Sequence, residues 1–283
     1  MSKSLTNTEV VRIVDNHHWK APPRMESPYL FVSNKSPETS STAYSDELMK
    51  MLDVGATSSW WYETRNQVIW HAIRRYPISG ALWDIGSGLG EVSSYLTSVG
   101  AECVAVEPNR LGAQVSSEKG VLSIQGDLHA LELPASSIEA VGLFDVLEHL
   151  DNADDVLSEI YRVLGSEGKL FLTVPATKWL WSASDDLAGH HLRYTRKKIR
   201  QQLNNAGFEV LSIQYFFFSL VLPILILRAV PYRLGVRSLI DDTKLVQKKS
   251  GWVSRLITKV EVALCGKIPI GTSLVIVATK KSL

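Results

Sequence analysis

The chain of 283 residues is predicted to fold as an α/β domain with a doubly wound, mostly parallel sheet. Three observations predict this. A short apolar strand at 81–84 breaks into a glycine-rich turn, and apolar residues at helical spacing follow that turn. Three further apolar runs each lead into polar or acidic residues, and segments of helical pattern lie between strands. Such alternation is typical of parallel sheets that bind ligands at the carboxyl ends of their strands.

The glycine-rich turn follows Asp84 and reads Gly86-Ser87-Gly88-Leu89-Gly90. Glycine tolerates positive φ and has no Cβ, so backbone N–H groups can approach a ligand closely before the next helix begins. A dinucleotide loop of the G-x-G-x-x-G pattern would place its third glycine at position 91, where the chain has Glu91. The spacing therefore argues against a nicotinamide cofactor.

The ends of the next three strands carry residues suited to hold a ligand. The run from 103 to 106 ends at Glu107, roughly 20 residues after the first glycine, where doubly wound folds place an acid that binds ribose hydroxyls. The run from 121 to 124 leads to Gln125-Gly126-Asp127-Leu128, and the run from 140 to 144 leads to Asp145-Val146-Leu147-Glu148-His149-Leu150. We expect all four strand ends to point the same way.

In this order, the motifs resemble the class I S-adenosyl-L-methionine (SAM) dependent methyltransferases, in the methyltransferase type 11 and quinone-methyltransferase-like branch. The resemblance covers about residues 58 to 214 and the last strand. It implies a Rossmann-like, doubly wound, seven-stranded sheet that is mostly parallel with an antiparallel last strand at 272–278. The cofactor would be SAM, with S-adenosyl-L-homocysteine (SAH) as product.

The resemblance also implies roles for single residues. Asp84 would support the glycine loop, Glu107 would bind the ribose, and Asp127 would meet the adenine amino group beside the backbone N–H of Leu128. The full set of implied cofactor-binding residues is Asp84, Gly86, Ser87, Gly88, Gly90, Glu107, Pro108, Asp127, Leu128, Phe144, Asp145 and Val146.

A polar and aromatic stretch after the fifth strand, at 179–195, is predicted to be a substrate loop, because it follows a strand at the ligand-binding edge. Its residue order resembles a stretch in the same methyltransferase branch, and the resemblance implies substrate contacts from Trp181, Asp185 and Arg193. The branch usually has a further basic residue where this chain has Leu192, which weakens an inference about substrate charge.

Methyl transfer needs the nucleophile held close to the methyl group and, for a hydroxyl acceptor, removal of its proton. The candidate catalytic residues are His190, His149 and Tyr194, with His190 favoured as base or substrate binder because a histidine titrates near neutral pH. His149 can instead pack or orient. No metal site is expected, because His190 and His191 lie on an irregular segment without a second cluster of ligand spacing.

The chain is expected to divide into five parts. These are an extended N-terminal arm (1–45), an N-terminal helical lid (46–78), a SAM-binding methyltransferase core (79–214), an apolar and basic insertion (215–270), and the last strand with the C-terminus (271–283).

The charge of the chain is unevenly distributed. Residues 190–260 contain thirteen Lys or Arg and three Asp or Glu, whereas the whole chain has a net charge of +1. The same stretch holds an apolar run at 215–228, which is shorter than the roughly 20 residues that span a bilayer. Two interpretations stay open: a buried strand followed by a core helix, or an interfacial helix that rests on anionic lipid.

The amino-acid composition limits the classes of protein to which this chain can belong. The chain has 45% hydrophobic residues and two cysteines, which predicts a globular fold without a disulfide framework. A cytoplasmic protein that can lie peripherally on a membrane is expected, without nucleic acid as partner. The leading hypothesis is methylation of an O or N atom of a lipid-linked, quinone-like or glycosyl small molecule. The alternatives are tailoring of a soluble secondary metabolite and a non-catalytic SAM-binding partner of the same fold.

Overall fold

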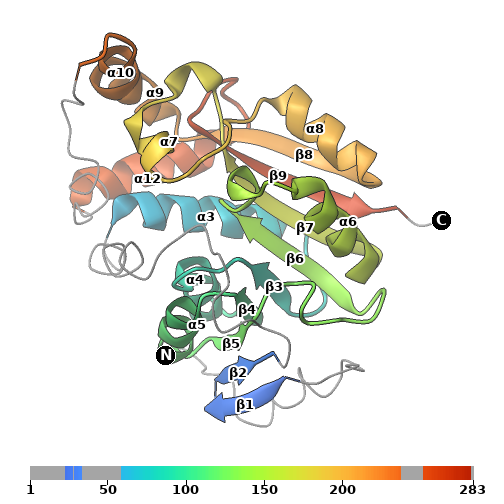
Figure 1. Cartoon of the computed structure of the whole chain (residues 1–283). Helices are drawn as coiled ribbons and strands as arrows, with labels where there is room; N and C mark the ends of the chain where they lie inside the picture. Colours follow the sequence, from blue (N-terminus) through green and yellow to red (C-terminus); the bar gives the residue numbers. More distant parts are fainter. Residues whose placement is uncertain (1–22, 28, 34–58, 237–250, 282–283) are drawn as a thin grey trace.

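The computed structural model describes residues 23–27, 29–33, 59–236 and 251–281. Within these ranges the strands form one sheet in the order β1-β2-β5-β4-β3-β6-β7-β9-β8 (Figure 1). The strands are β1 (Arg24–Ser27), β2 (Leu30–Val32), β3 (Leu82–Ile85), β4 (Cys103–Glu107), β5 (Leu122–Gln125), β6 (Ile138–Phe144), β7 (Leu164–Pro175), β8 (Phe208–Phe216) and β9 (Ser273–Lys280).

The centre of the sheet is parallel, and both of its ends contain antiparallel pairs. β2, β5, β4, β3, β6 and β7 pair in parallel, so their carboxyl ends share one edge. β9 is antiparallel to both β7 and β8, as expected for the last strand. The sheet is thus doubly wound and Rossmann-like, which confirms the predicted fold class.

The predicted number of seven strands is wrong, because the described residues contain nine. The two additional strands, β1 and β2, come from the segment predicted to be an extended arm. β2 pairs in parallel with β5, and its Leu30 and Phe31 are buried. Only three residues of β2 join the sheet, which is too short a run for hydrophobic periodicity to reveal. The rest of the arm and residues 46–58 of the expected lid lie outside the described residues.

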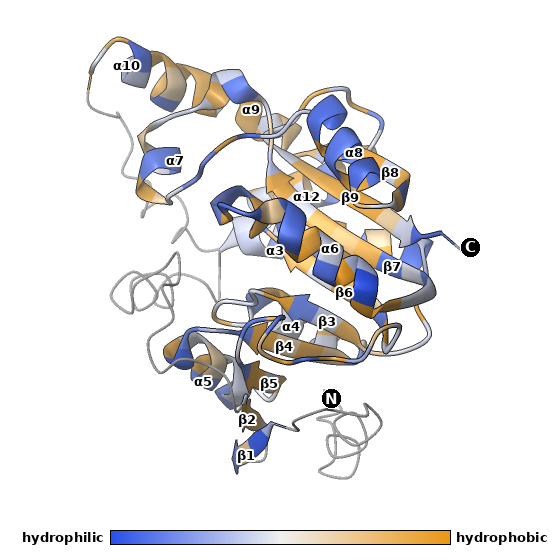
Figure 2. Cartoon of the chain, turned by 45° about the vertical axis from the view of Figure 1, so that its right-hand side comes forward, coloured by the Kyte–Doolittle hydropathy of each residue, from blue (hydrophilic) through white to orange (hydrophobic). Residues whose placement is uncertain are grey.

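Helices cover both faces of the sheet (Figures 1 and 2). The α-helices are α3 (Trp60–Arg75), α4 (Glu91–Ser98), α5 (Arg110–Glu118), α6 (Ala153–Val163), α7 (Ala183–Leu187), α8 (Arg196–Asn205), α9 (Val221–Ile224), α10 (Val230–Arg233) and α12 (Trp252–Leu264). Shorter turns are the 3-10 helices η1 (Leu147–His149), η2 (Lys178–Leu180) and η3 (Phe218–Leu220) and the π-helical η4 (Leu225–Ala229).

Two hydrophobic clusters hold the layers together. Successive residues of a strand point to opposite faces, so Leu82 of β3 packs with α3 and α4, whereas Trp83 packs in the cluster that includes residues of α6 and α8. Central parallel strands that are buried on both faces read as continuous apolar runs. This explains why the sequence predicts them well.

The apolar run at 215–228 does not form one uniform element. Phe216 ends β8, and η3, α9, η4 and α10 follow as consecutive helical turns from 218 to 233. Leu220, Val221 and Ile224 are buried against the sheet, whereas Leu222 and Ile226 are 65% and 60% exposed. One face of this helical segment therefore belongs to the core and the other faces solvent. No helix in the described ranges is long and apolar enough to cross a membrane.

Candidate functional site

The glycine loop connects β3 to α4 at the carboxyl edge of the sheet. Gly86, Gly88 and Gly90 all have positive φ. A Cβ at Gly90, the N-cap of α4, would lie 2.3 Å from the Ser116 hydroxyl oxygen of α5, so a side chain cannot fit there. A Cβ at Gly88 would meet no described atom within 4 Å. The loop therefore packs against α5 at Gly90 and is open at Gly88.

Glu107 fixes the open part of this loop from the end of β4. Its Oε2 accepts the backbone N–H of Gly88 (2.8 Å) and its Oε1 accepts the backbone N–H of Asn109 (2.8 Å). Burial raises the pKa of Glu107 to about 7, although these two hydrogen bonds act in the opposite direction. A carboxylate that has spare acceptor capacity beside a glycine loop can accept hydroxyl donors from a sugar. Pro108 continues the chain directly after this carboxylate.

Asp84 lies in β3, just before the loop, and contacts the helix that follows it. Its side chain is 1% exposed, and its Oδ2 accepts the hydroxyl of Ser93 in α4 (2.5 Å). Burial raises the pKa of Asp84 to about 6. Asp84 therefore connects β3 to the helix that follows the loop, and its supporting role in cofactor binding stays a prediction.

The end of β5 brings Asp127 and Leu128 to the same edge. Asp127 Oδ1 accepts the backbone N–H of Ala130 (2.8 Å), which orders the turn, and Leu128 is buried in the core. This placement leaves the adenine contact of Asp127 a prediction.

The end of β6 contacts both the glycine loop and helix α3. A Cβ at Gly86 would lie 2.9 Å from Val146 Cγ2, so Val146 packs directly on the loop, and Phe144 is buried just before it. Asp145 has φ +56° and accepts a hydrogen bond at Oδ2 from Arg65 Nη1 of α3 (2.8 Å). The pair fixes α3 to the strand end.

Arg65 is a site residue that sequence reasoning did not identify. Its guanidinium lies 4.9 Å from the Trp61 ring centroid and 5.1 Å from that of Tyr62. Its partner, Asp145, is 80 residues away in the sequence, so no local sequence pattern reveals the pair.

The residues around the loop fit SAM. Gly88 faces open space, the Glu107 carboxylate adjoins it, and the buried Ser87 hydroxyl has no hydrogen-bond partner among the described residues. An unpartnered buried hydroxyl is unfavourable unless a ligand satisfies it. These groups are suited to hold the ribose and the amino-acid part of such a cofactor.

Two candidate histidines come together beside β6. The ring centroids of His149, in η1, and His190, after α7, lie 4.9 Å apart. His190 Nδ1 is 2.9 Å from Asp185 Oδ1, and Glu148 is 1% exposed. Burial, with a smaller effect of His190, lowers the pKa of His149 to about 4, and burial raises the pKa of Glu148 well above its ordinary value.

The predicted substrate residues have partners within the protein. Arg193 is buried and donates from Nε to Asp185 Oδ1 (2.8 Å) and from Nη2 to Asp185 Oδ2 (3.1 Å). The Trp181 indole N–H donates to Asp186 Oδ1 (2.9 Å), and the Tyr232 hydroxyl of α10 donates to Asp186 Oδ2 (2.7 Å). Asp185 and Arg193 thus order the loop and orient His190, while Trp181 helps to connect the loop to α10.

Tyr194 is the third candidate catalytic residue. It is 1% exposed within the core, and burial raises the pKa of its phenol. A phenol that is this difficult to ionise is a poor proton acceptor, which argues against the catalytic role proposed for it from the sequence.

Comparison with known proteins places this site in a family. Residues 43–213, more than half of the chain, match the family model described as a methyltransferase domain. A probable S-adenosylmethionine-dependent methyltransferase of Mycolicibacterium smegmatis is 26% identical over 160 residues, which cover 55% of this chain and 62% of that protein. A malonyl-[acyl-carrier protein] O-methyltransferase of Methylococcus capsulatus is 26% identical over 145 residues, covering 47% of this chain and 53% of that protein.

These two alignments therefore span less than two thirds of each relative. A solved structure of a SAM-dependent methyltransferase from Thermotoga maritima, described as a possible histamine N-methyltransferase, superposes with a TM-score of 0.54 at 18% identity. The superposition covers 83% of this chain and 95% of that chain, and at this identity it shows the fold alone. Together with the family match, the glycine loop and the sheet order show that this chain belongs to the methyltransferase-domain family of class I SAM-dependent methyltransferases.

Proposed function

We propose that this chain transfers a methyl group from SAM to an oxygen or nitrogen atom of a small, membrane-associated molecule, with SAH as the second product. The observation that carries the proposal is the open glycine loop held by Glu107, whose Oε2 accepts the Gly88 N–H. Relatives named for O-methyl transfer and for possible N-methyl transfer share the fold, so the class of acceptor atom is left as O or N.

Each part of the site has a role in this proposal. Glu107 accepts the ribose hydroxyls, the Ser87 hydroxyl and the loop amides hold the amino-acid part, and the β6 end borders the reacting methyl group. The residues that would hold SAM are those of the loop, Gly86, Ser87, Gly88 and Gly90, those of the β4 and β5 ends, Glu107, Pro108, Asp127 and Leu128, and those of the β6 end, Phe144, Asp145 and Val146. Asp84 supports the loop from below.

The cofactor, when bound, supplies an electrophilic methyl group on a sulfonium. The protein has to hold the acceptor in line with that group, exclude water and allow the acceptor to lose its proton. His149 and His190 lie beside the β6 end, where they can contact the acceptor. The lid helix α3 and the loop at 179–195 would enclose the reaction.

The pH dependence of SAM binding tests the role of Glu107. Its pKa of about 7 means that the free protein holds a protonated carboxyl below neutral pH. A protonated carboxyl accepts ribose hydroxyls less well, so we expect SAM affinity to fall about tenfold between pH 8 and pH 6. Isothermal titration calorimetry at several pH values measures this. Glu107→Gln should bind weakly with little pH dependence; an unchanged slope in this variant would assign the titration to another group.

A labelled-methyl assay tests the proposed activity directly. Incubating the protein with methyl-labelled SAM and either a lipid extract or an aqueous extract should place the label mainly in the lipid fraction. Label in the aqueous fraction would favour the soluble-metabolite alternative. SAM binding without label in either extract would favour a non-catalytic SAM-binding protein.

The membrane part of the proposal depends on two exposed stripes of apolar side chains. One consists of Leu222, Ile226, Val230 and Leu234, four residues apart along the helical segment 218–233 and its C-cap, and the other of Trp252, Leu256 and Val260 along α12. We call these seven side chains the exposed apolar face. Spacing of four residues aligns side chains on one side of a helix, so each stripe is continuous.

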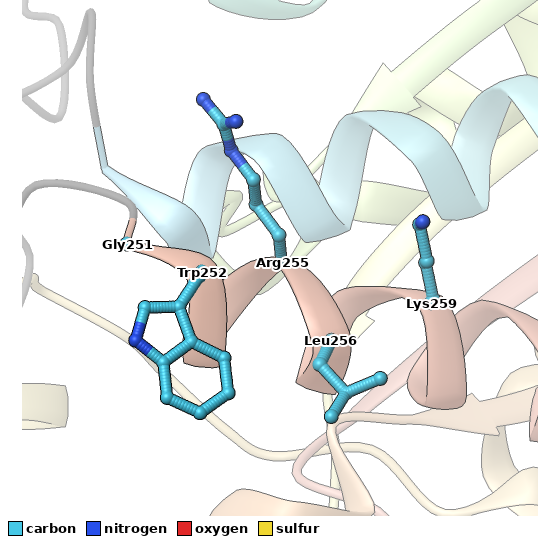
Figure 3. A pocket seen from close by; sticks show the side chains of 5 residues that line it. All are labelled: Gly251, Trp252, Arg255, Leu256 and Lys259. Atoms are coloured by element: carbon cyan, nitrogen blue, oxygen red, sulfur yellow. The ribbon is translucent and has the colours of Figure 1, made fainter.

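Charges accompany both stripes. Trp252, which is 80% exposed, and Leu256 point to one side of α12 in Figure 3, whereas Arg255 and Lys259 point to the other. A shallow groove runs along these four residues and Gly251. Arg233 is exposed on α10. Apolar side chains with flanking cations are typical of helices that lie on anionic membranes.

Hydrogen bonds hold the two stripes near the site. Glu261 of α12 accepts the backbone N–H of Phe218 (3.2 Å) and of Ser219 (2.9 Å), at the start of the helical segment. The Thr64 and Thr258 hydroxyls are 2.6 Å apart, which fixes α12 to the lid helix. Asp186 joins α10 to the substrate loop. A membrane bound at the exposed apolar face would therefore lie against elements that contact α3 and the loop at 179–195.

Vesicle cosedimentation tests this surface. The wild-type protein should sediment with vesicles of anionic lipid and dissociate as salt rises, because ions screen surface attraction. The double variant Leu222→Asp with Ile226→Asp should lose most of this binding and keep its fold, because both side chains are already exposed. Val99→Asp, another partly exposed apolar site distant from this face in sequence, is the control and should bind as the wild type does. Equal binding by the double variant and the control would contradict the membrane proposal.

A further inference from the structure

Glu148, His149 and His190 form a compact group of potential ligand atoms. One ligand atom from each residue can be chosen so that all three lie within 4.8 Å of one another. Glu148 and His149 come from η1, directly after the β6 end, and His190 comes from the loop after α7. The backbone N–H of His191 donates to the Glu148 carbonyl (2.8 Å), which holds the two segments together.

The Glu148 carboxyl group points into this group of residues without a hydrogen bond. Its side chain is 1% exposed, and neither Oε1 nor Oε2 has a hydrogen-bond partner among the described residues. His190 Nε2 is 4.0 Å from Oε1, which is too long for a hydrogen bond. A buried carboxylate is costly unless it takes up a proton or a cation compensates its charge.

His190 is oriented as metal-binding histidines commonly are. Its Nδ1 lies 2.9 Å from Asp185 Oδ1, and Arg193 holds the same carboxylate in place. When Nδ1–H donates to Asp185, the lone pair of Nε2 is directed toward Glu148. A carboxylate that accepts a hydrogen bond from the ring nitrogen that does not bind the metal fixes the tautomer of the imidazole. It also increases the basicity of the nitrogen that binds the metal.

We propose that Glu148, His149 and His190 bind a divalent first-row cation such as Zn²⁺ or Mn²⁺ beside the β6 end, and that this cation holds an oxygen of the acceptor. Imidazole and carboxylate ligands suit these ions, with bonds of about 2.0–2.2 Å. Two ligands at tetrahedral angles lie about 3.4 Å apart on such bonds. The 4.0 Å between Glu148 Oε1 and His190 Nε2 needs to shorten only by a small side-chain movement.

The role in catalysis rests on the proposed function, whereas binding of the cation does not. A bound divalent cation lowers the pKa of a coordinated hydroxyl, as it does for water. The acceptor O–H bond would break with its proton passing to solvent, an O–C bond would form, and the S–C bond of the sulfonium would break to leave the neutral thioether SAH. The acceptor would then be an oxygen rather than a nitrogen, and His190 would be a ligand rather than the base.

Cation binding to the full chain without SAM tests the proposal. Electron paramagnetic resonance should detect binding of Mn²⁺, and calorimetry should detect binding of Zn²⁺, with about one ion per chain. Loss of one of three ligands should weaken binding in Glu148→Gln and His190→Ala by at least roughly 10- to 100-fold, the range for loss of a residue that only supports a ligand. His191→Ala is the matched control, because this neighbouring histidine is 44% exposed and outside the cluster, and it should bind as the wild type does.

Two results would overturn the proposal: no Mn²⁺ or Zn²⁺ binding by the wild type up to about 1 mM, or equal loss in His190→Ala and His191→Ala. If Glu148→Gln does not fold, His149→Ala and His190→Ala carry the test. SAM binding is measured on the same samples. Binding of SAM without binding of the cation would contradict this inference alone. Binding of the cation without binding of SAM would contradict the proposed function.

Discussion

Replacing Gly88 by alanine is expected to weaken SAM binding at least tenfold, which corresponds to about 1.4 kcal/mol. Gly88 has φ +55° and faces open space, so the added methyl group would enter the region that the cofactor needs. The left-handed backbone would also cost roughly 1–2 kcal/mol for a residue with a Cβ. Calorimetric titration with SAM measures the affinity, and urea unfolding measures the stability.

Gly100 provides a matched control for this variant. It has φ +95° and would also meet no described atom within 4 Å, but it follows α4 and lies outside the loop. Gly100→Ala should lose a similar amount of stability and keep wild-type SAM affinity. If both variants lost affinity equally, backbone strain rather than contact with the cofactor would explain the effect, and Gly88 would not face SAM.

Replacing Arg65 by alanine is expected to lower the free energy of unfolding by about 3 kcal/mol. Arg65 donates to Asp145 at 2.8 Å with only 9% of its side chain exposed, and its loss would leave a partly buried carboxylate without its partner. Removal of one member of a buried pair typically costs about 3–5 kcal/mol, and the 22% exposure of Asp145 places the effect low in that range. The lost contacts with Trp61 and Tyr62 add to it.

Arg74→Ala is the control on the same helix, because Arg74 is exposed, and it should change stability by less than about 0.5 kcal/mol. Arg65→Ala should also weaken SAM binding, because it releases the lid helix from the strand end beside the cofactor loop. A stability loss below about 1 kcal/mol in Arg65→Ala would show that the ion pair does not hold the lid helix.

The parts of the fold that the sequence predicts well are those with local signals. The strand ends at Ile85, Glu107, Gln125 and Phe144 share one edge, as expected from apolar runs that each lead into polar residues. The glycine loop is recognisable in the sequence because positive φ at positions 86, 88 and 90 favours glycine. Its contacts with SAM stay predictions.

The features that the sequence does not reveal depend on contacts between distant segments. β2 has three residues and joins the sheet only because β5 offers a free edge. Arg65 and Asp145 are 80 residues apart, and His190 is about 40 residues from Glu148. Sequence spacing argued against a metal site because each segment alone lacks the ligands, whereas the fold brings the two segments together.

The same distinction applies to the apolar run at 215–228. Hydropathy alone left a choice between core and membrane surface, and the structure divides the run between buried and solvent-exposed side chains. Ile224 is 8% exposed and Ile226 is 60% exposed, although both are isoleucines two positions apart. Only the packing of one helical face against the sheet decides which residue is exposed.

Calorimetric titration of the full chain with SAM, SAH and NADH tests the central claim most directly. The account predicts that SAM and SAH each bind at about one site per chain, that Gly88→Ala and Glu107→Gln weaken both, and that NADH gives no binding heat. Binding of NADH together with no heat and no thermal shift from SAM at millimolar concentration would contradict it.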